Sequence, residues 1–103
     1  MEIIENVNLI KKANIYFNGN VTSRTFIENE EKKSLGIMMP GEYNFGTQEA
    51  ELMEILDGDV DVRLKGQDSW QKYTADSSFD VPANSSFDIK VNVITDYCCS
   101  YLK

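Results

Sequence analysis

The chain has 103 residues, with 17 acidic and 10 basic side chains and a formal net charge of −7. This acidic balance disfavours nucleic acid as a partner, because contacts to phosphate backbones need clustered Lys and Arg. The chain contains no histidine, which excludes Ser-His and Cys-His nucleophilic chemistry and disfavours a tight zinc, iron or copper site.

Residues 1–12 are predicted to form an N-terminal arm on a domain made of residues 13–103. The apolar residues of this segment follow no single period, so an edge strand and a short helix both remain possible. We expect an ordered arm that lies on the domain or on a neighbouring subunit. The segment lacks the basic start and continuous apolar core of a secretion signal, and no run of about 18 apolar residues predicts a membrane span. A cytoplasmic location is expected.

Short alternating runs separated by turn residues follow the arm. Residues 14–17 predict a short strand, residues 18–20 a turn, and residues 21–27 an alternating strand. The charged run at 28–33 predicts a solvated turn, with its two lysines on a loop near the open end of the domain.

The segment 35–64 is the most informative part of the chain. Pro40-Gly41 separates two apolar runs, and Asp57-Gly58 predicts a tight hairpin because glycine tolerates the positive φ of such turns. Alternation at 60–64 predicts a half-buried returning strand. If one parity faces the interior throughout, the inward side chains are Ile37, Met39, Tyr43, Phe45, Thr47, Glu49, Glu51, Met53 and Ile55.

The C-terminal third predicts four more strands, at 70–73, 77–81, 87–93 and 95–102. Pro82 to Ser85 predicts a turn between two of them. The adjacent Cys98 and Cys99 point to opposite faces of a strand, so a bond between them would be strained and both are expected to be reduced. Many short strands with regular turns indicate a single all-β domain, a sandwich or a barrel.

Two segments resemble the motifs of the cupin superfamily. The first is Pro40-Gly41-Glu42-Tyr43-Asn44-Phe45, followed by Glu51 and Gly58, and the second is Pro82-Ala83-Asn84-Ser85-Ser86-Phe87. The resemblance implies an RmlC-like jelly-roll barrel, the cupin fold.

In metal-binding cupins these motifs supply three histidines and a glutamate. The histidine positions fall here at Phe45, Thr47 and Phe87, and only Glu51 keeps its residue type. The resemblance therefore implies a cupin barrel without its metal site and without a cofactor.

A closer resemblance, over residues 14–102, is to the small cupin family of pyrimidine/purine nucleoside phosphorylases. It implies a cytosolic homodimer that splits many nucleosides with phosphate into a free base and ribose 1-phosphate. The residues that carry it are Tyr16-Phe17-x-Gly19-x-Val21-x-Ser23, Gly36-x-Met38-x-x-Gly41-Glu42-Tyr43-x-Phe45-x-Thr47-x-Glu49-x-Glu51, Val81-Pro82 through Phe87, and Tyr101-Leu102. Three positions depart from the pattern: Asp76 replaces a usual glycine, and Lys32 and Ser100 stand where relatives can carry Arg or another basic residue.

Phosphorolysis needs a site for the anion, a carboxylate for the ribose hydroxyls and a flat apolar slot for the base. The candidate catalytic residues are Glu49 and Glu51, and the candidate phosphate ligands are Arg24 and Lys32. The candidates for substrate binding are Tyr43, Phe45, Thr47, Phe87 and Tyr101. Each also has an ordinary explanation, as core packing, an exposed loop or a solvated charge.

Two other functions remain open from the sequence. A non-catalytic cupin that binds a small molecule explains the loss of the metal ligands equally well. An interaction protein would instead use Phe26, Met38 and Leu52 as a dimer surface.

Overall fold

The computed structural model describes residues 2–102, and apart from one short 3₁₀ turn its regular elements are all strands. Among these residues no helix is long and apolar enough to cross a membrane. The all-β prediction is confirmed. In chain order the elements are β1 (Asn8–Leu9), β2 (Asn14–Tyr16), η1 (Phe17–Gly19), β3 (Val21–Glu28), β4 (Glu31–Met38), β5 (Gly41–Thr47), β6 (Ala50–Asp57), β7 (Asp59–Leu64), β8 (Gln71–Thr74), β9 (Ser77–Val81), β10 (Ser85–Val91) and β11 (Thr95–Leu102).

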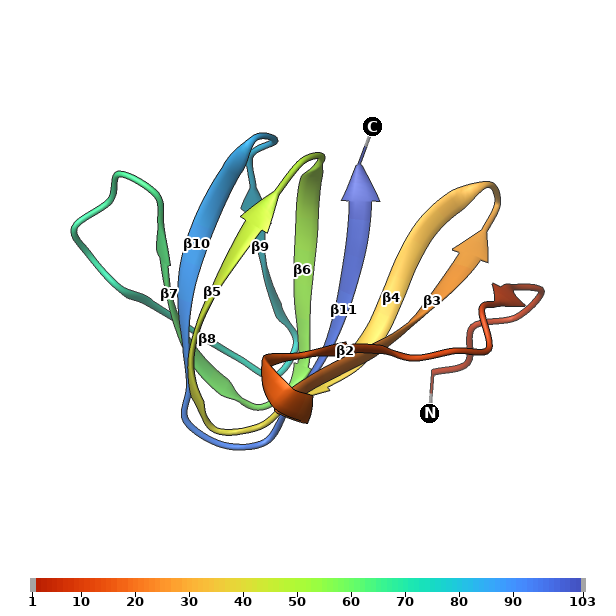
Figure 1. Ribbon diagram of the computed structural model, residues 1–103, viewed down its shortest axis with the longest axis horizontal. Helices are drawn as coiled ribbons and strands as arrows, with labels where there is room; N and C mark the ends of the chain where they lie inside the picture. Colours follow the sequence, from red (N-terminus) through yellow and green to blue (C-terminus); the bar gives the residue numbers. More distant parts are fainter. Residues whose placement is uncertain (1, 103) are drawn as a thin grey trace.

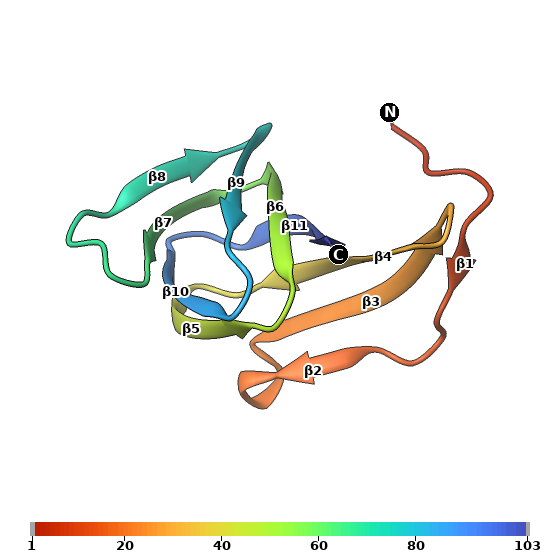
Figure 2. The same cartoon turned by 90° about the horizontal axis from the view of Figure 1, so that it is seen from above.

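The strands form two antiparallel sheets that face each other (Figures 1 and 2). The larger sheet has seven strands in the order β1-β3-β4-β11-β6-β9, with β2 also paired to β3. The smaller sheet has four, in the order β5-β10-β7-β8. Figure 2 shows β3, β2 and β1 extending beyond the part of the larger sheet that the smaller sheet covers. This arrangement is the predicted jelly-roll barrel.

The core lies between the sheets and follows strand alternation. Met38, Ile55, Val60 and Ile89 are fully buried. The prediction that Ile37 faces inward is wrong, and so is the same prediction for Met39. Both are more than a third exposed, because the chain crosses from one sheet to the other after β4 and alternation does not carry across that corner.

The predicted Asp57-Gly58 hairpin is also wrong, because β6 and β7 lie in different sheets and do not pair. Gly58 has a φ of +144°, and a Cβ added to it would overlap the Thr95 side chain, 2.8 Å from its Cβ. The dipeptide marks a backbone position that suits glycine. It does not specify whether the chain turns back or crosses over, and here it crosses over.

The charged segment 28–33 contains the predicted exposed turn, but the turn is a tight hairpin and its lysines are not on a loop. Asn29 and Glu30 have φ of 50° and 67° and form the whole turn between β3 and β4. Lys32 therefore lies on β4 instead of on a loop. Fixing it on a strand restricts which part of the barrel mouth its ammonium can reach.

The N-terminal residues run along the edge of the larger sheet. Asn8 and Leu9 pair with Ile27 and Phe26 of β3, and the chain before them turns back so that Glu2 lies beside β6 and β9 (Figure 2). Asp76, at the position where cupins prefer glycine, adopts a left-handed φ of 65°. The turn between β8 and β9 thus keeps the conformation that the usual glycine would supply.

We expect Gly58→Ala to lower the free energy of unfolding by about 2 to 4 kcal/mol, because the methyl group must displace Thr95 and the backbone resists this φ. Gly66→Ala is the matched control. Gly66 has a φ of +84° with nothing within 4 Å of its Cβ site, so only about 1 kcal/mol should be lost. Urea denaturation measures both, and equal losses would contradict a tightly packed corner.

Candidate functional site

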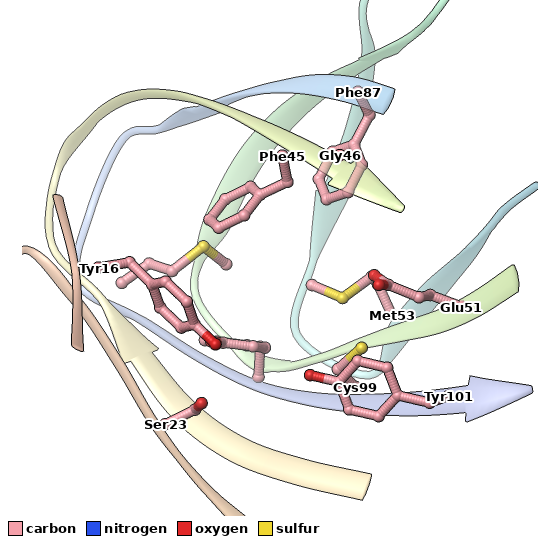
Figure 3. A pocket seen from close by; sticks show the side chains of 11 residues that line it. Tyr16, Ser23, Phe45, Gly46, Glu51, Met53, Phe87, Cys99 and Tyr101 are labelled. Carbon is pink, nitrogen blue, oxygen red and sulfur yellow. The ribbon is translucent and has the colours of Figure 1, made fainter. Parts of the chain in front are cut away.

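A cavity of about 210 Å³ opens between the two sheets. The smaller sheet contributes Phe45, Gly46 and Phe87 to its lining. Tyr16, the residue before η1, closes one end of the cavity (Figure 3). The larger sheet supplies Ser23, Met38, Glu51, Met53, Tyr97, Cys99 and Tyr101. The two sheets thus give the cavity an apolar side and a side rich in hydroxyl groups.

Phe45 and Phe87 form the aromatic wall of the cavity. They are directly opposite each other on β5 and β10, and their rings stack with centroids 5.5 Å apart and planes 26° apart. Together the two rings give this side of the cavity an aromatic, apolar lining. The wall can accept another flat ring without any hydrogen bond to the edge of that ring.

Strand register creates the polar wall, which consists of Ser23, Glu51, Tyr97, Cys99 and Tyr101. Tyr101 on β11 is opposite Glu51 on β6, and Cys99 is opposite Met53. The Tyr101 hydroxyl lies 3.3 Å from Ser34 Oγ, and Tyr97 and Ser23 are both opposite Gly36 of β4 in the strand register. Alternation places all these groups on the concave face of the larger sheet.

Glu51 carries the perturbed carboxyl group of the cavity. Burial raises the pKa of Glu51, the hydrogen bond from the Cys99 thiol partly opposes this, the nearby Glu49 charge raises it further and Lys32 lowers it. Burial also raises the pKa values of Cys99 and Tyr101. Those two groups stay protonated near neutral pH and act as neutral donors, while Glu51 keeps its proton to a higher pH than an exposed glutamate.

Lys32 is the candidate cation that the structure brings to the cavity. Its Nζ lies 4.6 Å from the centroid of the Tyr101 ring. Arg24 lies on the opposite face of β3 from Ser23, and its Nε donates to the Lys11 carbonyl oxygen at 3.3 Å. Of the two candidate phosphate ligands, only Lys32 is therefore beside the cavity lining. Ser100 faces the other side of β11 from Cys99 and Tyr101, so a basic residue there would not face the cavity.

The remaining predicted site residues lie around the cavity rather than in its lining. The Tyr43 hydroxyl donates to the Met39 carbonyl oxygen at 2.7 Å. Thr47 Oγ1 donates to the Pro82 carbonyl oxygen at 2.7 Å and accepts from the Ser85 amide at 3.0 Å. Glu49 is exposed in the turn between β5 and β6. Tyr43 and Thr47 thus use their hydroxyls to hold the chain that carries the aromatic wall.

Sequence reasoning missed five polar residues of this region. The alternation that selects Tyr101 on the last strand also selects Tyr97 and Cys99, so these two were accessible from the pattern. Tyr16 and Ser23 belong to the family motif near the N-terminus, but nothing local indicates that β2 and β3 reach the cavity. Ser34 was missed because the preceding residues, Lys32 and Lys33, were assigned to a loop.

The positions that the cupin resemblance assigns to metal-binding histidines do not offer a ligand set. Phe45 and Phe87 are stacked, and the Thr47 hydroxyl is already bonded to backbone. Within residues 2–102 no group of three or more His, Cys, Asp or Glu side chains is placed to hold a metal ion.

Comparison with known proteins gives concordant findings for sequence and fold. A family model described as pyrimidine/purine nucleoside phosphorylase matches residues 11–101. A protein of that name from Geotalea uraniireducens is 59% identical over 103 residues, which cover 99% of each chain.

Two solved structures show how far the fold is shared. A protein of unknown function from Acinetobacter sp. ADP1 superimposes with a TM-score of 0.93 at 34% identity, over 97% of this chain and 98% of that one. An RmlC-like cupin from Shewanella frigidimarina gives a TM-score of 0.70 at 14% identity, over 97% and 86% of the two chains. The second likeness concerns the fold alone and confirms the cupin barrel.

We expect Thr47→Val to destabilise the protein by about 1 to 3 kcal/mol, because it leaves the Ser85 amide without its side-chain acceptor and removes the bond to Pro82. Thr47→Ser keeps the hydroxyl and should lose less than half as much. Thermal unfolding of the two variants makes the comparison. A Thr47→Val variant as stable as Thr47→Ser would show that this hydroxyl does not hold the two turns together.

Proposed function

The chain belongs to the pyrimidine/purine nucleoside phosphorylase family, and we propose that it cleaves purine and pyrimidine nucleosides with phosphate in the cavity between its sheets. The products are the free base and ribose 1-phosphate. The observation that supports this site is a cavity with a stacked aromatic wall facing a wall of neutral donors and one half-buried carboxyl group.

The base stacks on Phe45 and Phe87. Stacking makes no demand on the hydrogen-bonding edge of a base, so purines and pyrimidines can share the slot. The cavity of about 210 Å³ is smaller than the roughly 300 to 1,000 Å³ of most ligand pockets. The base therefore occupies the interior, while the ribose and phosphate lie toward the mouth.

Lys32 and the Tyr101 hydroxyl bind phosphate at the mouth. The ammonium supplies a point charge, and the hydroxyl supplies a neutral donor whose proton is retained because burial raises the Tyr101 pKa. Arg24 has no part in this arrangement, since its guanidinium is directed to the N-terminal segment.

In the reaction a phosphate oxygen forms a bond to C1′ while the bond from C1′ to the base nitrogen breaks, through a transition state with oxocarbenium character. The bonding pair leaves with the base, which then needs a proton. Glu51 in its acid form donates that proton, and the exposed Glu49 accepts from a ribose hydroxyl at the mouth. A raised pKa suits Glu51 to the donor role, because it extends the pH range in which the acid form exists.

The other two functions have less support. A non-catalytic binding cupin would share the cavity, but the name carried by the relatives favours the enzyme. An interaction protein would need Phe26 and Met38 at its surface, and both are buried.

We also propose a cytoplasmic homodimer. The two cysteines are buried and free, which suits a reducing compartment. The outer face of the larger sheet exposes a row of apolar side chains: Ile15 and Ile37 are both register partners of Thr22, and Leu35 is exposed nearby. A second copy of the chain would cover this row.

Glu51→Gln should lower kcat by roughly a hundredfold to ten-thousandfold, the usual contribution of a general acid, in an assay of phosphate-dependent base release from inosine and uridine. Glu54→Gln, on the same strand but the opposite face, should retain activity. Absence of base release by the unmodified protein with either nucleoside would rule out the proposed reaction, and full activity of Glu51→Gln would remove Glu51 from it.

The same variant also has a predicted stability profile. Because folding raises the Glu51 pKa above its ordinary value of 4.5, the folded state keeps a proton that the unfolded state has lost. Stability therefore falls as pH rises from about 4.5 through the raised pKa. Glu51→Gln lacks this fall, so its stability relative to the unmodified protein should grow across that window. A difference that is constant with pH in urea denaturation would contradict the raised pKa.

Ile37→Asp should convert the protein from a species of twice the chain mass of 11.7 kDa to a monomer, because it places a charge in the apolar row. Ile94→Asp is the control, since Ile94 is exposed in the turn between β10 and β11 and is not on the strands that carry that row. Analytical ultracentrifugation distinguishes the species. A monomeric unmodified protein would contradict the homodimer, and a dimeric Ile37→Asp variant would contradict this surface.

A further inference from the structure

The turn from Tyr16 to Asn20 has a backbone conformation that its residues do not favour. Phe17 has a φ of 51° and Asn18 a φ of 56°. Asparagine tolerates the left-handed region, but a bulky residue such as phenylalanine is an outlier there. Such strain persists only where surrounding contacts enforce it, and it is often found at functional sites.

Hydrogen bonds tie this turn to the barrel. The Phe17 carbonyl oxygen accepts from the Asn20 side-chain amide at 2.9 Å and from the Asn20 backbone amide at 3.1 Å. The Asn20 carbonyl oxygen in turn accepts from the Met39 amide at 2.8 Å. The turn is thereby fixed against the corner where the chain crosses from β4 to β5.

The strained backbone directs two rings to the cavity region. Tyr16 lines the end of the cavity, as Figure 3 shows. The Phe17 ring is not part of the cavity lining but contacts the aromatic wall: its centroid is 5.3 Å from that of Phe45 in an edge-to-face arrangement and 5.0 Å from that of Tyr43. Phe45 thus contacts both Phe17 and Phe87.

We propose that the Tyr16–Asn20 turn sets the base preference of the enzyme, with Phe17 as the positioning residue for Phe45 and Tyr16 as the wall that closes the slot. This inference rests on the proposed function. It concerns a different step, the choice between one-ring and two-ring bases rather than the cleavage itself.

The physical reason is the unequal size of the bases. A pyrimidine has a smaller stacking area than a purine, so a shift of Phe45 removes a larger share of its contact with the aromatic wall. Removing the Phe17 ring takes away one of the contacts that fix Phe45. The loss therefore penalises pyrimidine nucleosides more than purine nucleosides.

Phe17→Gly tests the proposal, because it deletes the ring and also relieves the backbone. We expect the ratio of kcat/KM for inosine to kcat/KM for uridine to rise roughly threefold to tenfold, the size of one aromatic contact. The change should come mainly from KM for uridine, since stacking is present in both the ground state and the transition state. Asn18→Gly relieves the same turn while keeping both rings, and its ratio should stay within twofold of the unmodified protein.

Two further variants test the proposal if Phe17→Gly does not fold. Asn20→Ala keeps the ring but removes its side-chain restraint, and Phe17→Leu keeps an apolar side chain without the aromatic edge. Each should shift the ratio in the same direction by a smaller factor. An unchanged ratio in these variants, or an equal fall for both nucleosides, would overturn the proposal and leave Phe17 with a structural role only.

A binding measurement separates this proposal from the proposed function. If the unmodified protein cleaves neither nucleoside, the phosphorylase function fails, and the slot is then tested by calorimetric titration with hypoxanthine and uracil. Weaker binding of uracil relative to hypoxanthine in Phe17→Gly would support the role of the turn. Equal changes for the two bases, or no binding of either base by the unmodified protein, would overturn it.

Discussion

The antiparallel pairing of β11 between β4 and β6 decides which side chains meet in the cavity. It places Tyr101 opposite Glu51 and Cys99 opposite Met53, and it places Cys99 opposite Ser34 on the other side. A slip of one residue would turn Cys98 and Ser100 inward in place of the present set. The polar wall is therefore a property of strand register, and the smaller sheet needs to add only two stacked rings to complete the site.

This arrangement also addresses an electrostatic difficulty. A chain with a net charge of −7 repels phosphate at long range, and Lys32 is the one candidate phosphate-binding cation that the structure places beside the cavity. A Glu51 that keeps its proton to higher pH removes one negative charge from the neighbourhood of the anion. The tyrosine hydroxyls and the Cys99 thiol add donors without adding charge. In the proposed function, the anion is thus bound mainly by neutral donors.

Local signals in the sequence were sufficient for much of the fold. The strand at Ser77–Val81 and the last strand at Thr95–Leu102 have the predicted bounds, and the turn between β9 and β10 has Asn84 at a φ of 53°. Phe45, Phe87, Glu51 and Tyr101 could be selected by alternation and motif, and all four line the cavity. Their roles in the reaction remain proposals.

What could not be predicted depends on partners distant in sequence. Whether Asp57-Gly58 closes a hairpin depends on the sheet that the next strand joins, and the inward parity of β4 depends on a crossing that the dipeptide pattern does not reveal. Ser23 and Tyr16 reach the cavity only because β2 and β3 extend the larger sheet past β4. Each of these features depends on the order of the strands in the two sheets, which a short window of sequence does not specify.

The corner at Gly58 has a consequence for how molecules enter and leave. Because a single residue joins β6 to β7, one strand of each sheet is tethered to the other at the closed end of the barrel, and the sheets cannot swing apart as hinged domains do. In the proposed function, molecules exchange instead through rotamer changes of exposed side chains beside the cavity, such as Lys32. Such motions are completed in picoseconds to nanoseconds for exposed side chains, far faster than the microsecond-to-millisecond closure of a two-domain enzyme.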